Sequence, residues 1–591
     1  MRPFSTLLSA LWRYSSGKRY LLVLYISMLF AANISLLLEP YIVGQALNLL
    51  QQSATLERPL RSLSLALFAI LGINILFWLF HGPARVIERR MAFDVRTQYK
   101  DHLFRIITTL PVQWHKDNHS GGSINRIGKA TRALYDFTGG SWQIIEMIVR
   151  SLGSIVALAL IMPTAAAMAF SLSALALGVV FFFDAILLKR YEELNSKDHL
   201  VASALHDYVT NIITVITLRL EALTQSELYR RMTSYIPLYQ RSVVINEAKW
   251  FAMTIAISCM QVATLLWYVF RTVGSGDVPL VGSFFMLYDY LQKIGGSFYN
   301  FGWKYSMTVE QYADLLSAED ILSAEPASRY SGLRLPAEWR SIDVSHLHFT
   351  YQDEEHRTHH LKNLSFTLQK GKKVALVGES GSGKSTLMAL IRGLQVSDRA
   401  DVMADGVRLP GGLQHLAAHT TLIPQDPEIF ASTIEYNISV DTDVPEAELM
   451  RDVELAQFSS VLARLPKGLQ SDVSEKGVNL SGGEKQRLAL ARGIFAAKSS
   501  DIILLDEPTS SVDSDNERKI YENIFSHFSD RCIVSSIHKL HLLPLFDYIY
   551  VLSDGEIQEE GSFHELLEKH GRLWHLWEQY QRDVKSNTLH S

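Results

Sequence analysis

Four residues in the second half of the chain have the types and the spacing of a phosphate-binding loop. The pattern G-x-x-x-x-G-K-[ST] is filled by Gly378, Gly383, Lys384 and Ser385. Glycines let the backbone turn tightly and come close to phosphates, so that the loop N–H groups form a nest for an anion. Lys384 can reach the β- and γ-phosphates of a nucleotide, and the Ser385 hydroxyl can bind Mg²⁺. We predict a nucleotide site formed by Gly378, Glu379, Ser380, Gly381, Ser382, Gly383, Lys384, Ser385 and Thr386.

Two carboxylates follow an apolar run further along the chain. The residues 502–505 predict a buried strand, and Asp506 and Glu507 come directly after it. Asp506 is placed to hold Mg²⁺, and Glu507 to orient or deprotonate an attacking water. An apolar run followed by two acidic residues is by itself weak evidence for a catalytic site. In a chain that also has a phosphate-binding loop, it predicts hydrolysis of the bound nucleotide.

Strands and helices of an α/β domain must position these residues. Val374–Val377 predicts a buried parallel strand before the loop, and the periodicity from Ser385 to Leu394 predicts a helix after it. From Ser341 to Trp577, strand-like and helix-like runs alternate. We therefore expect an interfacial helix at 1–18, a helical transmembrane domain at 19–322, a linker at 323–340, an α/β nucleotide-binding domain at 341–578 and a tail at 579–591.

Length and composition bound the class of protein. A chain of 591 residues is long enough for more than one domain. The net charge of -5 argues against a nucleic-acid binder, which usually carries a basic stripe. Cys259 and Cys532 lie far apart, so we expect neither a disulfide framework nor a metal site of cysteines.

Apolar residues crowd the first half, where segments of about 20 residues are long enough to cross a bilayer. The six predicted spans are Tyr20–Val43, Leu60–Phe80, Ile144–Met162, Thr164–Leu188, Phe251–Phe270 and Leu280–Trp303, the last being the least apolar. Lys and Arg concentrate in the two long loops after spans two and four, so the positive-inside rule puts both termini in the cytoplasm. Both long loops show helical periodicity, so we expect the spans to continue below the membrane and turn there.

The N-terminal residues predict an amphipathic helix on the cytoplasmic membrane surface, not a cleaved signal. One helical face is formed by Phe4, Leu7, Leu8, Leu11 and Trp12. The alternative is a helix buried against the rest of the protein.

Polar residues inside spans are costly and are candidates for function. Asp289 and Lys293 lie four residues apart, which predicts a mutually satisfied pair on one helix face. Asp184, near the cytoplasmic end of span four, is expected to be solvated. Asn74, His81 and Gln261 are expected to bond between helices.

The segment Leu480–Arg487, with the sequence LSGGEKQR, resembles the signature motif of ABC transporters. The other motifs of that family follow in order. Tyr351 matches the aromatic residue that stacks on adenine, Gln425 the Q-loop glutamine, Ser474–Gly477 the loop before the signature in exporters, Ser510–Asp513 the D-loop, and His538 the switch histidine. The six spans with two long cytoplasmic loops resemble the exporter-type (type IV) layout.

This resemblance implies an all-α six-helix transmembrane domain followed by an α/β P-loop nucleotide-binding domain, with ATP and Mg²⁺ as ligands. It assigns Glu507 and His538 to catalysis, and Ser385, Gln425 and Asp506 to the metal. Tyr351, Gln425, Ser481, Gly482, Gly483 and Asp513 would contact ATP. The helix after Ser481 would bind the γ-phosphate of a second copy, so we expect a homodimer, with a heterodimer as the alternative.

Two departures from the family pattern leave the catalytic groups in place. Glu484 stands where glutamine is commoner, and the arginine usual beside the switch histidine is absent after His538. Two competent ATP sites are therefore expected. In the long loops, Trp114 and His115 are candidates for the first coupling helix, and Asp207, Tyr208 and Asn211 for the second.

The resulting hypothesis is an ATP-driven half-transporter in the cell membrane, by resemblance the bacterial inner membrane, with its nucleotide-binding domain in the cytoplasm. It would export or flip an amphipathic drug, lipid or lipid-linked molecule. A peptide exporter, an importer of a metal chelate, and an ATP-gated channel or regulatory subunit remain alternatives. The absence of a peptidase-like domain before span one argues against leader-cleaving peptide export, and the six spans exclude a soluble ABC ATPase.

Overall fold

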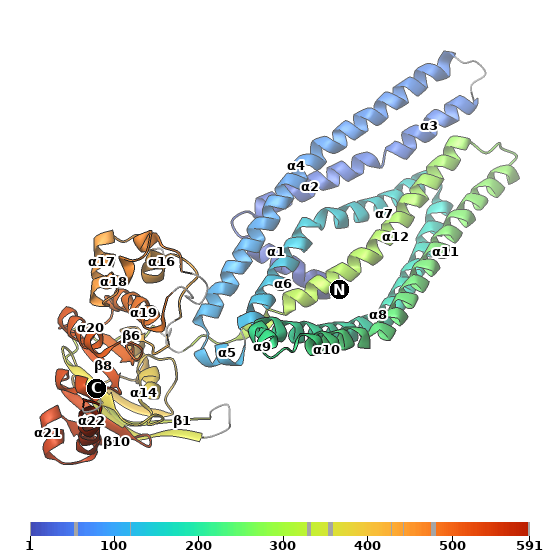
Figure 1. Ribbon diagram of the computed structural model, residues 1–591. Helices are drawn as coiled ribbons and strands as arrows, with labels where there is room; N and C mark the ends of the chain where they lie inside the picture. The colour runs from blue at the N-terminus through green and yellow to red at the C-terminus, as the bar shows by residue number, and fades with distance from the viewer. Residues whose placement is uncertain are drawn as a thin grey trace. The chain divides into compact units, whose positions relative to one another are not determined.

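The computed structural model describes residues 2–52, 57–118, 120–327, 332–352, 358–426, 428–440, 442–473 and 480–588. The chain divides into two compact units (Figure 1). The helical unit comprises Met1–Arg105 and Ser120–Ser323, and the nucleotide unit comprises Ile106–His119 and Ala324–Ser591. The predicted loop Ser474–Gly477 lies outside the described residues.

Helices of very different lengths make up the helical unit. They are α1 (Arg2–Tyr14), α2 (Arg19–Leu36), α3 (Glu39–Gln52), α4 (Glu57–Thr109), α6 (Ser120–Gly139), α7 (Ser141–Ile161), α8 (Pro163–Thr210), α9 (Ile212–Thr217), α10 (Glu221–Ser234), α11 (Ile236–Gly274), α12 (Val281–Leu316) and α13 (Glu319–Ser323). With 48 residues, α8 is about 72 Å long, far more than the roughly 30 Å of hydrocarbon in a bilayer. The expectation that spans continue beyond the membrane is confirmed for this helix.

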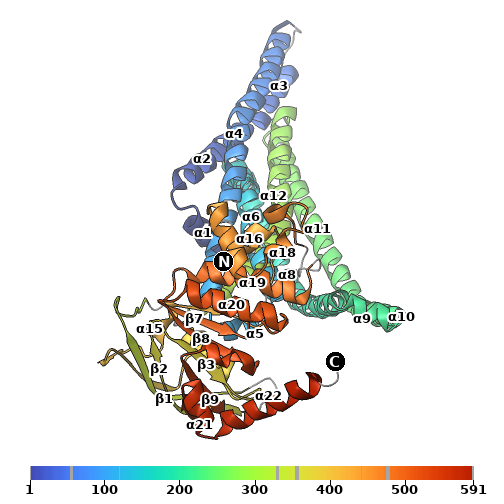
Figure 2. The same cartoon turned by 60° about the vertical axis from the view of Figure 1, so that its left-hand side comes forward.

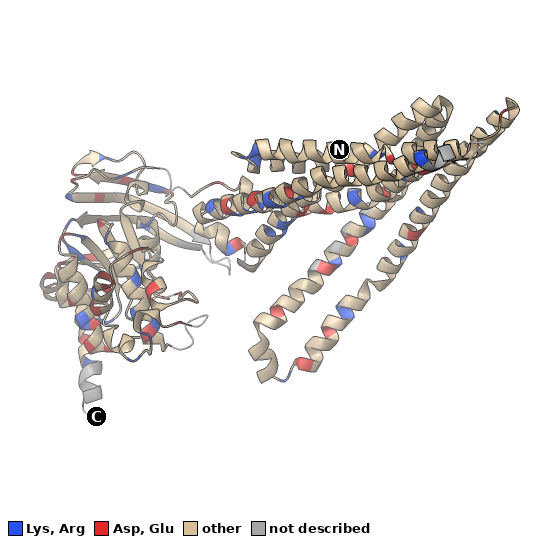
Figure 3. Cartoon of the chain, turned by 90° about the horizontal axis from the view of Figure 1, so that it is seen from above, with Lys and Arg blue, Asp and Glu red and all other residues tan. Residues whose placement is uncertain are grey.

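Five segments among the described residues are long and apolar enough to cross a membrane. They are Arg19–Gln52, Arg61–Thr109, Gly121–Ile161, Pro163–Thr210 and Glu221–Gly274. The sixth predicted span lies in α12, which does not reach that hydropathy. It packs along α3, α7 and α11, with Leu287, Leu291 and Ile294 fully buried. The side of a helix that packs on protein does not face lipid and can carry more polar residues. Figure 3 shows long stretches without charge on the helices and frequent charges in the nucleotide unit.

The N-terminal helix α1 has two apolar surfaces instead of the single predicted face. Leu7 and Leu11 are buried inside the helical unit, where α1 packs on α6 and α12. Phe4, Leu8 and Trp12 are 41%, 45% and 47% exposed. The buried-helix alternative therefore holds for one side of α1, and the other side is free to meet a membrane surface. The sequence pattern could not distinguish the side that packs on protein from the side that is exposed, because apolar residues three and four positions apart lie on adjoining faces of a helix.

Polar residues of the long helices pair within the protein. The predicted pair is confirmed, with Lys293 Nζ 2.8 Å from Asp289 Oδ2. The expectation that Asp184 is solvated is wrong, because Lys249 of α11 reaches its Oδ1 at 3.0 Å. The expectation that Asn74 bonds between helices is also wrong, because its amide donates to the Ile70 carbonyl of its own helix at 3.0 Å. A polar side chain in a helix can satisfy itself on the preceding turn without any partner helix.

A buried carboxylate that the sequence did not single out joins three helices. Glu88 of α4 is fully buried and pairs with Arg85 on the same helix. Its Oε1 accepts hydrogen bonds from Ser141 Oγ at 2.7 Å and from the Trp142 backbone N at 3.0 Å, both at the start of α7. Ser141 Oγ in turn shares a hydrogen bond of 3.2 Å with the Tyr25 hydroxyl of α2. This network holds α2, α4 and α7 together.

The nucleotide unit contains two sheets. Its strands are β1 (Ser341–Gln352), β2 (Thr358–Gln369), β3 (Lys373–Val377), β4 (Arg399–Ala404), β5 (Val407–Arg408), β6 (Thr420–Ile423), β7 (Ile502–Asp506), β8 (Cys532–Ile537), β9 (Tyr548–Ser553) and β10 (Glu556–Gly561). The strand orders are β2-β1-β4-β5 and β10-β9-β3-β8-β7-β6, and Figure 2 shows β7, β8, β3 and β9 in that succession. Within the larger sheet, β9, β3, β8, β7 and β6 are parallel.

The larger sheet is buried on both faces, on one by helices and on the other by α14 and the strands of the smaller sheet. The following α-helices belong to the nucleotide unit. They are α5 (Val112–Asp117), α14 (Lys384–Ile391), α15 (Gln414–Ala417), α16 (Ile434–Ser439), α17 (Glu446–Leu455), α18 (Ser459–Leu462), α19 (Gly482–Ala497), α20 (Ser514–His527), α21 (Phe563–Glu568) and α22 (Arg572–Thr588). Every residue of β3 and β8 is buried. Parallel strands that are covered on both faces consist of continuous apolar residues. The sequence could therefore predict these strands. Their carboxyl ends meet at one edge, where the site lies.

Candidate functional site

The phosphate-binding loop connects β3 to α14. Gly383 is the N-cap of α14 with φ +102°, and a Cβ there would lie 2.4 Å from Leu361 Cδ2. Only glycine fits both the backbone conformation and the space. The Lys384 ammonium is buried and donates to the carbonyl oxygens of Gly378 at 2.8 Å and Glu379 at 3.0 Å. Burial lowers the pKa of Lys384, while Glu507 and Asp506 oppose that shift.

The carboxylate of Asp506 accepts hydrogen bonds from two hydroxyl groups. Asp506 ends β7 and lies opposite Ser536 of β8 in the sheet register. Its Oδ1 accepts from Ser536 Oγ at 2.7 Å and from Ser385 Oγ at 3.2 Å. A carboxylate beside a hydroxyl is a set of hard oxygen atoms, which is the chemistry that Mg²⁺ prefers. These residues therefore fit the predicted metal, and Ser536 is an addition that the sequence did not indicate.

The second carboxylate is held by two predicted residues. Glu507 has φ +47°, and its backbone N donates to Ser536 Oγ at 3.1 Å. Its Oε1 lies 2.7 Å from His538 Nε2, and its Oε2 accepts from Gln425 Nε2 at 3.1 Å. The structure thus brings together the acid after β7, the histidine after β8 and the glutamine after β6. The left-handed backbone is a strained conformation of the kind found at functional sites.

These groups open into a cleft of about 710 Å³. Its predicted lining residues are Ser380, Gly381, Gly383, Lys384, Ser385, Thr386, Gln425, Glu507 and His538. Sequence reasoning missed five others, which are His360, Leu361, Lys362, Asp554 and Gly555. They come from β2 and from the turn between β9 and β10, which belong to no motif. The one available indication was the Asp-Gly pair, which predicts a tight turn but not its neighbours.

The remaining loop residues flank the cleft. Ser382 is buried, and the Glu379 carboxylate reaches Arg572 at 3.2 Å. Tyr351 lies in β1 opposite His359 of β2, and its side chain is outside the described part of the structure.

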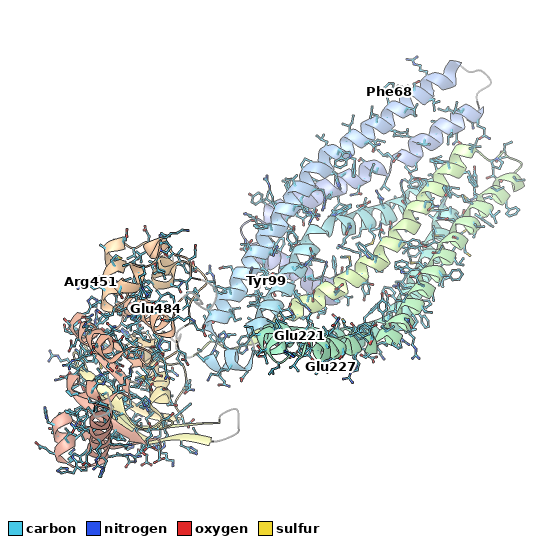
Figure 4. The ribbon with its side chains drawn as sticks, in the orientation of Figure 1. Phe68, Tyr99, Glu221, Glu227, Arg451 and Glu484 are labelled. Carbon is cyan, nitrogen blue, oxygen red and sulfur yellow. The ribbon has the colours of Figure 1, made fainter. Side chains whose placement is uncertain are left out.

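The signature residues lie at the start of α19, and none of these described side chains lines the cleft. Ser481 is the N-cap, and its backbone N donates to Glu484 Oε2 at 2.8 Å in a capping box. Figure 4 labels Glu484 within the nucleotide unit. The hydrogen bond from the Ser481 backbone and the neighbouring Arg464 lower the pKa of Glu484. The uncommon acid therefore caps its own helix. Asp513 similarly caps α20, accepting from the Asn516 backbone N at 3.0 Å.

The candidate coupling residues lie on short elements. Trp114 and His115 are on α5, which belongs to the nucleotide unit, where the Ala327 backbone N donates to the Thr109 carbonyl at 2.8 Å. Asp207 and Tyr208 lie in the last turn of α8, and the Asn211 amide donates to the Asp207 carbonyl at 3.0 Å. These placements describe where the residues are, and their coupling role stays a prediction.

Two family models match the chain. One, described as the ABC transporter transmembrane region, matches residues 22–294, and the other, described as ABC transporter, matches residues 361–510. Together they cover both units of the fold.

The chain is similar to curated proteins over most or half of its length. It is 28% identical over 504 residues to heavy metal tolerance factor 1 of Caenorhabditis elegans, covering 82% of this chain and 61% of that protein. It is 32% identical over 315 residues to ATP-binding cassette sub-family B member 6 of Rattus norvegicus, covering 52% and 37%. The chain thus spans less than two thirds of the length of these relatives.

A solved structure has the same fold. The structure of a bacterial Atm1-family ABC exporter with ATP bound aligns with a TM-score of 0.82, covering 95% of this chain and 99% of that chain at 23% identity. At 23% sequence identity, this similarity shows a shared fold.

Proposed function

Because the chain belongs to the ABC transporter family, with a membrane region fused to an ATPase region, we propose that it is an ATP-driven half-transporter of which two copies form the working unit. It is a multi-pass membrane protein, and the proposed cargo is an amphipathic drug, lipid or lipid-linked molecule that is moved outward across a bacterial inner membrane. The observation that carries the ATPase part is one cleft lined by Lys384 and Glu507, with Asp506 bonded to the lining residue Ser385.

The residues of the cleft divide the work of hydrolysis. Lys384 binds the terminal phosphates, exchanging its backbone carbonyl partners for phosphate oxygens. Ser385, Gln425 and Asp506 would hold Mg²⁺, which supplies charge neutralisation of the phosphates when bound. Glu507 takes the proton of the attacking water, with His538 and Gln425 fixing its two carboxylate oxygens.

A second copy is supported by what one copy leaves incomplete. Ser481, Gly482 and Gly483 begin α19, whose N-terminal N–H groups suit a phosphate, yet they do not line the cleft of their own chain. At the turn of α8 into α9, apolar side chains are exposed although no bilayer is expected there. They are Leu205 (48%), Val209 (59%), Ile213 (78%) and Ile216 (57%). An exposed apolar surface of this kind is typical of a protein–protein interface. A dimer with C2 symmetry would complete both ATP sites at the same time.

One face of α12 supports an amphipathic cargo. Phe284, Tyr288 and Trp303 are 39%, 42% and 53% exposed at helical spacing on that face. Between them, the Gln292 amide donates to the Tyr288 hydroxyl at 2.9 Å. Aromatic rings interleaved with amide and hydroxyl groups can contact both the apolar and the polar part of such a molecule.

The test is the ATPase rate of the purified protein in lipid nanodiscs, with Glu507→Gln as the blank. The panel contains lipids, drugs, peptides and metal chelates, the last also because of the name of the C. elegans relative. Stimulation by an amphipathic drug or lipid, with Mg²⁺-dependent turnover above the blank, is the expected result. Coupling is reciprocal, so a cargo that favours domain closure must bind more tightly when closure occurs.

Other outcomes would redirect the proposal. If peptides or metal chelates alone stimulate the ATPase rate, the cargo is a peptide or a chelate and not an amphipathic drug or lipid. Transport in sealed vesicles of known sidedness separates an exporter from an importer or a channel. A rate no higher than the blank would contradict a homodimer with two competent sites and point to a different partner chain.

A further inference from the structure

One side chain of the signature segment faces the interior of its own chain. Gln486 lies in the second turn of α19 and is 6% exposed. Its Nε2 donates to Ser510 Oγ at 2.7 Å and to the Gln425 carbonyl oxygen at 3.3 Å. Its Oε1 accepts from the Ser511 backbone N at 2.8 Å. A buried amide that is satisfied at both ends fixes the groups that it bonds, because leaving any of them unpaired is costly.

The backbone beside Gln486 is packed just as closely. A Cβ on Gly483 would lie 2.7 Å from the Ser511 carbonyl oxygen. There is thus no free space between the first turn of α19 and the loop that begins at Ser510. Since packed contacts of this kind do not deform continuously, the loop must move when the first turn of α19 moves.

Gln425 continues the connection to the catalytic acid. Its carbonyl accepts from Gln486, and its own side-chain amide donates to Glu507 Oε2 at 3.1 Å. A displacement of Gln486 therefore reaches the Glu507 carboxylate through a single intervening residue. The other oxygen of that carboxylate is held by His538.

We infer that Gln486 is a positioning residue that couples the two ATP sites of the dimer. The inference rests on the proposed function, in which Ser481–Gly483 contact the ATP of the second copy while Gln425 and Glu507 serve the ATP of the same copy. Occupancy of one site fixes the start of α19, and Gln486 transmits that position to Gln425 and to the loop at Ser510. Glu507 then reaches its hydrolytic geometry only when both sites are filled.

The experiment compares Gln486→Met with Gln486→Glu in the full-length protein in nanodiscs. Methionine matches the length of glutamine and removes all three hydrogen bonds, whereas glutamate keeps the acceptor for the Ser511 N–H and loses both donated bonds. Gln581→Met, at an exposed position of α22, is the matched control. The ATP dependence of hydrolysis gives the maximal rate and the Hill coefficient, and binding of a fluorescent ATP analogue in a Glu507→Gln background gives the affinity.

For Gln486→Met we expect a Hill coefficient that falls toward one and a maximal rate lower by about tenfold, with Gln486→Glu in between. ATP affinity is expected to stay within about threefold of the parent, which also shows that the nucleotide unit is folded. A parent that hydrolyses ATP cooperatively while Gln486→Met matches Gln581→Met would overturn the inference and leave the proposed function standing. A parent without hydrolysis above Glu507→Gln would overturn both.

Discussion

In the nucleotide unit, Lys384 and Glu507 line one cleft and Asp506 bonds the lining residue Ser385, whereas in the helical unit Glu88, Asp184 and Asp289 each pair with a neighbouring cation. Lys384 and Glu507 face a cleft that a ligand can enter, whereas the three carboxylates named in the helical unit are held in ion pairs. Charges that converge on a cleft are available for chemistry, and charges that satisfy each other hold helices in place.

The largest effect is expected from Glu507→Gln in the nucleotide unit. Loss of the general base should lower kcat by roughly 10²- to 10⁴-fold, while the isosteric amide leaves ATP binding within about threefold. Steady-state ATPase and titration with a fluorescent ATP analogue check the two parts separately. Turnover close to that of the parent would show that this carboxylate is not the base.

A change at Glu88 should act on stability instead of on nucleotide binding. Glu88→Ala leaves Arg85, Ser141 and the Trp142 N–H without their buried acceptor, which should cost about 3–5 kcal/mol. Thermal unfolding of the protein in nanodiscs should shift to lower temperature. Glu88→Gln, which keeps an acceptor for Ser141, should lose less. An unfolding temperature that does not move would break the distinction drawn between the two units.

Ser536 tests whether the cleft extends to residues outside the motifs. Ser536→Ala removes the hydroxyl that bonds both Asp506 and the Glu507 backbone, so we expect about a tenfold higher Mg²⁺ concentration for half-maximal activity. The neighbouring Ser535→Ala is the control, because Ser535 points to the other side of β8 and bonds Tyr521. Equal Mg²⁺ dependence in the two variants would remove Ser536 from the site.

The smallest effect is expected at the cap of α19. Glu484→Ala should cost about 1 kcal/mol of stability, and Glu484→Gln, which keeps the acceptor for Ser481 but loses the charge paired with Arg464, should cost less. The folded state holds the pKa of Glu484 below its ordinary value of 4.5. This stabilisation is therefore full above that value and is lost as the pH falls from there through the lower pKa of the folded state. Unfolding measured at descending pH should lose this component in the parent but not in Glu484→Gln.

Much of the ATP site could be predicted from the motifs alone. Residue type and spacing indicated Lys384, Asp506, Glu507, Gln425 and His538, and these residues meet as expected. The sequence predicted the long apolar helices of the helical unit. Its errors concerned the bonding partners of polar side chains, some of which lie far away in the sequence. Asp184 is such a case, because its cation Lys249 is 65 positions away in the sequence.

Local patterns along the chain were enough to predict the parallel strands of the nucleotide unit, the loops at their carboxyl ends and the long apolar helices. Local rules suffice there, since a buried strand needs a continuous apolar run and a phosphate loop needs glycine at fixed spacing. Other contacts became visible in the folded chain alone: Ser536 bonds Asp506, Glu88 joins α2, α4 and α7, and Gln486 links α19 to Gln425 and Ser510. These contacts join segments distant in the chain, and a hydrogen bond depends on the final positions of both partners, which no local pattern encodes.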